Sequence, residues 1–230
     1  AWLIIISLSI PMFMASLDNL VVTNALPVIR ADLGATLEEL TWTVNAYTLT
    51  FASCILMSSA LADRFGRRRV FLLGIFVFTA SSAWCGISDN IGTLITARTL
   101  QGIGGSAVMP LSLALLSTSV PERLRATAIG IWGGVAGLGV ALGPLIGGAV
   151  VEGMNWHAIF WINVPFGLLC IPLVWTTIPE SRGRPEPLDF PGLALVGIGL
   201  FGITYGIVRG NDAGWASMEV LTALIGGVLI

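Results

Sequence analysis

The sequence predicts an all-α polytopic membrane protein, and three observations support this fold class. The 230 residues are 55% hydrophobic and only 10% charged, whereas a soluble domain carries roughly 25% charged residues. Seven apolar runs follow one another, each about long enough to cross a bilayer as a helix. The turn at residues 59–69, S-A-L-A-D-R-F-G-R-R-R, places one acid and four arginines between two uncharged runs. Such a charged turn is typical of a loop at a membrane surface.

The apolar runs define the expected elements in order. Full spans are expected at approximately residues 2–28, 40–62, 70–88, 91–116, 127–151, 157–178 and 190–209. The last run, residues 218–230, stops short of the ~20 residues that a span needs. Residues 1–178 are therefore expected to form a six-span amino-terminal bundle, 179–189 a short loop, and 190–230 one full and one partial further span. The chain starts inside an apolar run, so we expect a fragment of a larger protein.

Charge alternates from one loop to the next, and this predicts the orientation. Eight of the eleven arginines fall on one side of the expected membrane, in the loops around residues 64–69, 123–125 and 182–184. Basic residues stay on the cytoplasmic side. The amino terminus and the loop 179–189 are therefore predicted to lie in the cytoplasm, and the expected location is the cell (plasma) membrane.

Asp18 is an ionisable residue inside the first expected span. Together with Asn19, Thr23 and Asn24 it forms a polar stretch in an otherwise apolar helix. Ionisable groups at membrane depth are costly and usually functional. A carboxyl group alone in an apolar medium favours its neutral form and can exchange protons near neutral pH. We expect Asp18 to handle protons or a cationic ligand; a structural pairing with a neighbouring helix is the alternative.

Arg98 is the second buried charge, in the fourth expected span, with Gln101 three residues later on the same helical face. An arginine cannot discharge itself, so it needs an acid, a carbonyl group or water. It forms either a structural ion pair or a charge that tunes a nearby proton-binding acid. Lesser polar residues inside the spans are candidates for lining a cavity, although such residues more often make one interhelical hydrogen bond: Asn19, Asn24, Asn45, Tyr47, Gln101 and Asn163.

The fifth expected span is rich in glycine. Gly139, Gly143 and Gly147 recur at intervals of four, a spacing that lets a neighbouring helix approach closely along one face. Pro144 removes one helical hydrogen bond, so we expect a kink there. The pattern predicts tight packing between helices. A further hypothesis is that this kinked helix also lies at a moving interface.

Several classes of protein are excluded or disfavoured by residues that the sequence lacks. It contains no lysine and one histidine, His157, and its three cysteines lie far apart inside apolar runs. Schiff-base chemistry is therefore excluded, a metal site is not expected, and we expect no cofactor. No H-E-x-x-H, G-x-S-x-G or phosphate-binding lysine loop occurs. An enzyme or a direct ATP user is disfavoured, and no nucleic-acid partner is expected.

Five segments resemble motifs of one transporter family, in the right order. They are the charged turn 59–69, L-D-N-L-V-V-T-N-A-L-P at 17–27, R-T-L-Q-G-I-G-G at 98–105, G-V-A-L-G-P-L-I-G-G at 139–148 and W-H-A-I-F-W-I-N-V-P-F-G at 156–167. Together they resemble the amino-terminal half of a major facilitator superfamily transporter, in its fourteen-span drug:proton antiporter branch. Two departures are Ser59, where the family has glycine, and His157, where arginine is expected.

The resemblance implies roles for particular residues. It assigns proton or cation coupling to Asp18 and Arg98. It assigns a cytoplasmic gating motif to Asp63, Arg64, Gly66, Arg67 and Arg68, and an antiporter motif to Gly139, Gly143, Pro144, Gly147 and Gly148. It also implies a six-helix bundle of the major facilitator type, followed by linker spans, with a second six-span half that lies beyond residue 230.

The implied function is proton-coupled efflux by alternating access, with a small-molecule substrate and protons as partners in the lipid bilayer. Lipophilic or cationic compounds or an antibiotic are the expected cargo, and the full-length chain is expected to work as a monomer. A metabolite facilitator or importer of the same fold is the main alternative. A receptor or scaffold is a further one, in which Asp18 would tolerate replacement.

Overall fold

The computed structural model describes residues 1–153, 155–183 and 189–230, and these residues form helices joined by short turns. The helices are α1 (Trp2–Leu33), α2 (Leu37–Phe65), α3 (Arg67–Cys85), α4 (Ile91–Ser119), α5 (Glu122–Gly153), α6 (Ala158–Trp161), α7 (Asn163–Thr177), α8 (Phe190–Ala213) and α9 (Met218–Leu229). Seven of the described spans are long and apolar enough to cross a membrane, with α6 and α7 counting as one. The all-α membrane fold class is confirmed.

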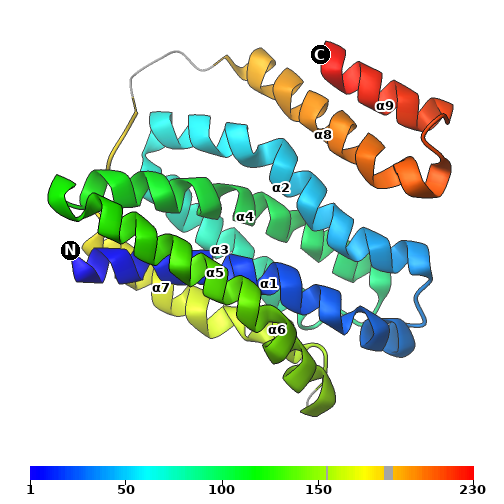
Figure 1. The fold of residues 1–230 in the computed structure, drawn as a ribbon, viewed down its shortest axis with the longest axis horizontal. Coiled ribbons are helices and arrows are strands. Elements are labelled where there is room, and N and C mark those ends of the chain that lie inside the picture. The colour runs from blue at the N-terminus through cyan, green and yellow to red at the C-terminus, as the bar shows by residue number, and fades with distance from the viewer. Residues whose placement is uncertain (154, 184–188) are drawn as a thin grey trace.

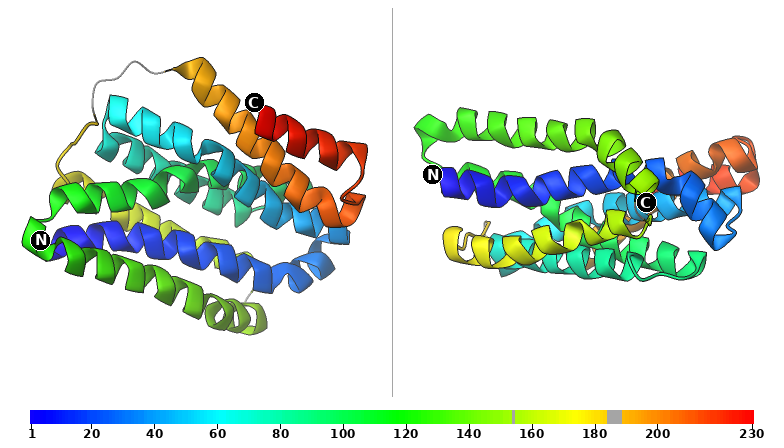
Figure 2. Two further views of the ribbon diagram at one scale, coloured as in Figure 1. Left: turned by 45° about the horizontal axis from the view of Figure 1, so that its top comes forward. Right: turned by 90° about the horizontal axis from the view of Figure 1, so that it is seen from below.

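The observed boundaries differ from the expected ones mainly at the ends of spans. α1 continues to Leu33 and α5 begins at Glu122, because helical hydrogen bonding does not stop where the apolar run stops. The sixth span comprises α6 and α7, and Ile162 between them keeps helical backbone angles, with φ −57° and ψ −37°. α5 remains helical through Pro144, and Figure 2 shows it changing direction toward its carboxyl end. Residues 184–188 of the expected loop 179–189 lie outside the described residues.

Local sequence signals explain why neighbouring helices turn back so sharply. Gly34 ends α1 in the left-handed region at φ 62°, which glycine adopts at little cost. Thr36 and Glu39 then form a reciprocal capping box at the start of α2. Gly66 alone separates α2 from α3, at φ 113°. Asn90 caps α4 by accepting a hydrogen bond from a backbone N–H. Short turns of this kind make sequential helices run antiparallel.

The helices pack side by side into a bundle (Figure 1). α1 packs extensively against α5 and also contacts α4 and α7, while α4 packs against α2 and α3. The right-hand view of Figure 2 shows α5, α1 and α7 in successive layers. α8 and α9 pack against each other, and α8 lies along α2. α1 and α4 therefore occupy the interior, where their polar residues meet.

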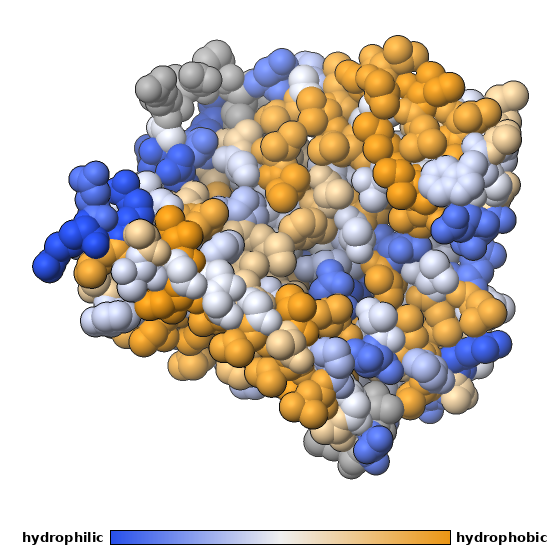
Figure 3. Space-filling view, viewed as in Figure 1, coloured by the Kyte–Doolittle hydropathy of each residue, from blue (hydrophilic) through white to orange (hydrophobic). Residues whose placement is uncertain are grey.

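The surface has the character expected of a protein in lipid. Large apolar side chains are exposed along the outer faces of the helices, among them Leu73, Phe76, Leu145, Leu168 and Ile198. In Figure 3 apolar residues cover α8 and α9 and much of the face below them, whereas hydrophilic residues gather mainly at the two ends. An apolar belt between polar ends matches a molecule that spans the bilayer.

Candidate functional site

Asp18 and Arg98 form a buried ion pair in the centre of the bundle. Arg98 Nη1 lies 2.6 Å from Asp18 Oδ2. Asp18 is 2% exposed and Arg98 is fully buried. Asp18 lies near the middle of α1, which runs from Trp2 to Leu33, so the pair sits far from both ends of the span. An isolated charge would be very costly at this depth, and the two opposite charges compensate each other.

Gln101 completes the α4 side of this pair. Its Oε1 accepts a hydrogen bond from Arg98 Nη1 at 2.8 Å, and its Nε2 donates to Asp18 Oδ1 at 2.9 Å. Residues three apart on a helix share a face, which is why Arg98 and Gln101 reach the same carboxylate. One helix thus supplies both a charged and a neutral donor to Asp18.

A second pair of polar residues reaches Asp18 from the other side. Asn163, the first residue of α7, donates from Nδ2 to Asp18 Oδ1 at 2.6 Å and to Ser82 Oγ at 3.0 Å. Ser82, on α3, donates in turn to the carbonyl oxygen of Phe160 at 2.9 Å. The Asp18 carboxylate therefore accepts hydrogen bonds from three side chains.

The guanidinium of Arg98 is further held by α2. Its Cζ lies 4.4 Å from the centroid of the Tyr47 ring, a cation–π distance, and its Nε donates to the carbonyl of Thr43 at 3.3 Å. Within the described residues, neither Arg98 Nη2 nor Tyr47 Oη has a hydrogen-bond partner, although both atoms are buried. We call Asp18, Arg98, Gln101, Asn163, Ser82 and Tyr47 the Asp18 cluster; it draws on α1, α2, α3, α4 and α7.

The glycines of α5 lie directly against α1 beside this cluster. A Cβ atom added at Gly143 would come within 2.6 Å of Leu20 Cβ, and one at Gly139 within 3.0 Å of the Phe13 carbonyl oxygen. At Gly147 the nearest atoms belong to Asn24 and Val21, at 3.3 Å. The tight packing expected from the spacing of four is confirmed. A Cβ at Gly148 would meet nothing within 4 Å, and Pro144 is exposed.

The charged turn between α2 and α3 is held by the segment that follows α7. Arg67 Nε pairs with Asp63 Oδ1 at 2.7 Å. The Arg67 backbone N–H donates to the Ser181 carbonyl at 2.8 Å, and the Gly183 N–H donates to the Asp63 carbonyl at 3.1 Å. Two stretches more than a hundred residues apart are thus joined through their backbones.

Glu180 is the acidic residue at the junction between the α2–α3 turn and the segment that follows α7. It was not among the residues predicted from the sequence. Its Oε1 accepts from the Arg68 backbone N–H at 2.9 Å, and its Oε2 lies 3.9 Å and 3.7 Å from the Nε atoms of Arg68 and Arg69. A Cβ at Gly66 would lie 2.7 Å from Glu180 Cδ, so only glycine fits there without displacement. Arg64 is exposed, with its guanidinium 6.0 Å from the Phe65 ring.

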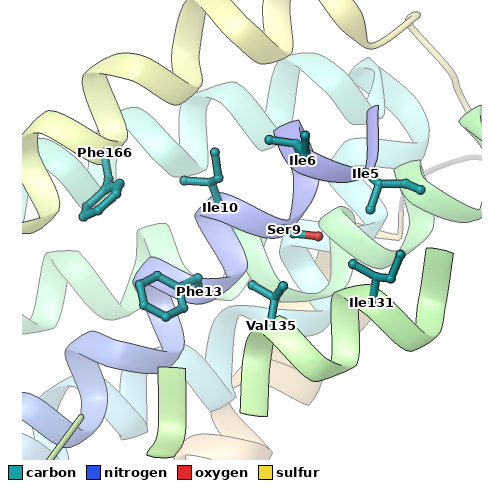
Figure 4. Close-up of a pocket in the computed structure, with 8 residues that line it drawn as sticks. All are labelled: Ile5, Ile6, Ser9, Ile10, Phe13, Ile131, Val135 and Phe166. Carbon is teal, nitrogen blue, oxygen red and sulfur yellow. The ribbon is translucent and has the colours of Figure 1, made fainter. Parts of the chain in front are cut away.

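The remaining residues expected to line a cavity lie apart from the Asp18 cluster. Asn24 is exposed and donates to the Leu20 carbonyl at 2.9 Å, while Asn19 and Asn45 are partly buried. An apolar cavity of about 220 Å³ lies between α1, α5 and α7 (Figure 4). Its lining contains none of the predicted site residues: Ile5, Ile6, Ser9, Ile10, Phe13, Ile131, Val135 and Phe166.

Comparison with known proteins places this geometry in a family. The model of the Major Facilitator Superfamily matches residues 8–230. The tetracenomycin C resistance and export protein of Streptomyces glaucescens is 35% identical, over 99% of this chain and 43% of that protein. The cephamycin export protein CmcT of Amycolatopsis lactamdurans is 40% identical, over 94% of this chain and 46% of that protein. The chain spans about two-fifths to one-half of the length of such curated relatives.

Solved structures share the architecture at low sequence identity. A peptide transporter POT in complex with sulfate superposes with a TM-score of 0.71 at 18% identity, covering 97% of this chain and 49% of that one. The human organic anion transporter MFSD10 gives a TM-score of 0.68 at 14% identity, covering 98% and 69%. Likeness at this identity concerns the fold alone. With the family match over residues 8–230 and the seven spans, the chain belongs to the major facilitator superfamily, a family of multi-pass membrane transporters.

Proposed function

We propose that the full-length protein exports a drug or antibiotic in exchange for protons. The export proteins for tetracenomycin C and cephamycin, and the multidrug transporter MdtP of Bacillus subtilis, are each at least 35% identical to this chain. Their names support export of lipophilic or cationic compounds or of an antibiotic. Because the chain covers less than half of each of these proteins, the activity belongs to the longer protein and its second half.

The observation that carries proton coupling is the Asp18 cluster. It places a carboxylate at the centre of a spanning helix, 2.6 Å from a buried arginine. Ionisable residues in this position mark proton or ion pathways in transporters. In the proposed cycle, a proton from outside neutralises Asp18 and removes most of its attraction to Arg98. α1 and α4 are then free to shift, and the two halves rock about a site near the bilayer midplane.

The charged turn is proposed to gate the cytoplasmic side. The Asp63–Arg67 pair and the contacts of Glu180 hold the α2–α3 turn against the end of the sixth span. Since α2 and α3 join at a single glycine, a movement at the turn moves both helices together. We propose that these contacts change as the cytoplasmic side opens and closes, with the amino terminus on that side.

The packing of α8 and α9 supports the fourteen-span arrangement. α8 lies along α2, where Arg209 contacts Glu38 at 3.1 Å, and it joins α9 through the 3.2 Å Arg209–Glu219 pair. The two helices thus form an additional pair at the edge of the six-span bundle (Figure 1). We propose that they link the bundle to a second one and that the full chain functions as a monomer.

The test is ethidium uptake into inverted membrane vesicles that carry the full-length protein, with and without an imposed pH gradient. Asp18→Asn removes the negative charge of the cluster, and Asp89→Asn removes an exposed acid as a matched control. We expect gradient-driven uptake in the parent and in the Asp89 variant, and its loss in the Asp18 variant. Unchanged uptake in Asp18→Asn would contradict coupling through this residue. Absence of uptake by the parent would contradict multidrug efflux and favour a carrier of narrower substrate range.

A further inference from the structure

Asn163 is the only described side chain that joins Asp18 to the sixth span by a hydrogen bond. The other two donors to the carboxylate, Arg98 and Gln101, both come from α4, so they move together. Asn163 is 1% exposed and stands at the first position of α7, directly after Ile162. It therefore connects the charged centre to the point where α6 and α7 meet.

A chain of hydrogen bonds continues from Asn163 to α6. Its Nδ2 donates to Asp18 Oδ1 at 2.6 Å and to Ser82 Oγ at 3.0 Å. Ser82 Oγ then donates to the carbonyl of Phe160, in α6, at 2.9 Å. Three buried hydrogen bonds thus lead from the carboxylate of α1, through α7 and α3, to the backbone of α6.

We propose that Asn163 is a positioning residue that holds the Asp18 carboxylate and transmits its charge state to the junction of α6 and α7. A hydrogen bond to a carboxylate is roughly twice as strong as one between neutral groups. When a proton neutralises Asp18, the Asn163 amide is held less tightly, and the sixth span separates more easily from α1. The role of this step in transport rests on the function proposed above; the positioning itself rests on the geometry.

The other groups around Asp18 are few and can be separated from Asn163. Arg98 faces it from α4, and Tyr47 stacks on Arg98 from α2. Cys85, on α3, lies 3.8 Å from Gln101 Oε1 through its Sγ atom. The α5 residues Gly139, Gly143 and Gly147 pack against this part of α1. An Asn163 variant leaves Arg98, Tyr47 and Cys85 unchanged, so a change in the infrared bands of the Asp18 carboxylate reports on the amide.

The structure provides a matched control on the same two helices. Ser7 Oγ and Thr177 Oγ1 lie 2.9 Å apart and also link α1 to the sixth span, but at the end remote from Asp18. Thr177→Val removes this link and keeps the shape of the side chain. A purely structural effect of loosening α1 from α7 would therefore appear in both Thr177→Val and Asn163→Ala.

The experiment is infrared difference spectroscopy of the full-length protein in lipid, following the carboxylate stretching bands that disappear in Asp18→Asn. Because a hydrogen bond to a carboxylate oxygen changes its stretching frequency, we expect Asn163→Ala to shift these bands. Thr177→Val should leave them in place. Unshifted bands in Asn163→Ala, or an equal shift in Thr177→Val, would overturn the proposal.

Two further measurements keep the outcomes distinct. If Asn163→Ala does not fold, Ser82→Ala removes one of the two partners of the amide, and a smaller shift in the same direction is expected; no shift overturns the proposal. Vesicle transport on the same proteins tests the function separately. Shifted carboxylate bands in a protein without gradient-driven transport would retain the positioning role and reject proton-coupled efflux.

Discussion

Removing one charge from the buried pair should lower protein stability by an amount that depends on which charge remains. Asp18→Asn leaves the charge of Arg98 fully buried with neutral partners: the Gln101 side chain, the Thr43 carbonyl, the Tyr47 ring and the new amide. Arginine cannot be deprotonated in a protein, so the unpaired charge stays. Breaking a buried pair in this way costs about 3–5 kcal/mol of unfolding free energy. Arg98→Met instead leaves a carboxylate that can bind a proton, so this variant should lose less stability, and its loss should shrink as the pH falls.

The assay is a double-mutant cycle on the full-length protein in mixed detergent micelles, with the free energy of unfolding measured by denaturant titration at pH 5 and pH 8. The double variant Asp18→Asn/Arg98→Met removes both charges of the 2.6 Å pair and should lie closer to the parent than the sum of the single variants. Independent sites add within about 0.5 kcal/mol. If the changes in unfolding free energy of the two single variants simply add at both pH values, the two charges do not compensate each other and the assignment is refuted. Equal losses of unfolding free energy in the two single variants, with no dependence on pH, would refute it as well.

Two further predictions concern packing and the cytoplasmic turn. Gly143→Val should cost about 1–3 kcal/mol of stability through overpacking, because its Cβ would lie 2.6 Å from Leu20 Cβ. In the matched variant Gly92→Ala the new Cβ meets only an atom at 3.5 Å, so thermal melting should be unchanged or improved; equal losses would contradict the close approach of α5. Glu180→Ala should release the segment after α7 and speed trypsin cleavage after Arg182, since the contact with the Arg68 backbone is lost; an unchanged cleavage rate would argue against the junction.

The sequence was sufficient for the fold because lipid imposes a strong and simple constraint. Apolar runs, charged turns and glycine spacing predicted the bundle and the close approach of Gly139, Gly143 and Gly147 to α1. Asp18 and Arg98 were each identifiable as costly charges. Their pairing joins residues eighty positions apart, and no local pattern shows which buried acid meets which buried base.

The details of the site depended on helix rotation and on tertiary contacts. Asn19 is adjacent to Asp18 in sequence, but successive helical residues point about 100° apart, so it lies on a different face and remains partly exposed. Ser82 is one of several serines in an apolar run, with nothing in its spacing to distinguish it. Glu180 follows the sixth span in a short polar loop, and only the folded chain brings it to Arg68.

The arginine in the cluster constrains how a proton can reach Asp18. Arg98 donates to Oδ2, and two amides donate to Oδ1, one of them from Asn163. A guanidinium offers no acceptor to a protonated carboxyl group, so a proton on Oδ2 would weaken the contact with Arg98. A proton on Oδ1 would require the Gln101 or Asn163 amide to turn or leave, since both donate to that atom. Uptake of a proton would therefore disturb contacts that join α1 to α4 and to α7, because each donor sits on a different helix from its acceptor. Under the function proposed above, this link between protonation and helix contacts is the property that coupled transport needs.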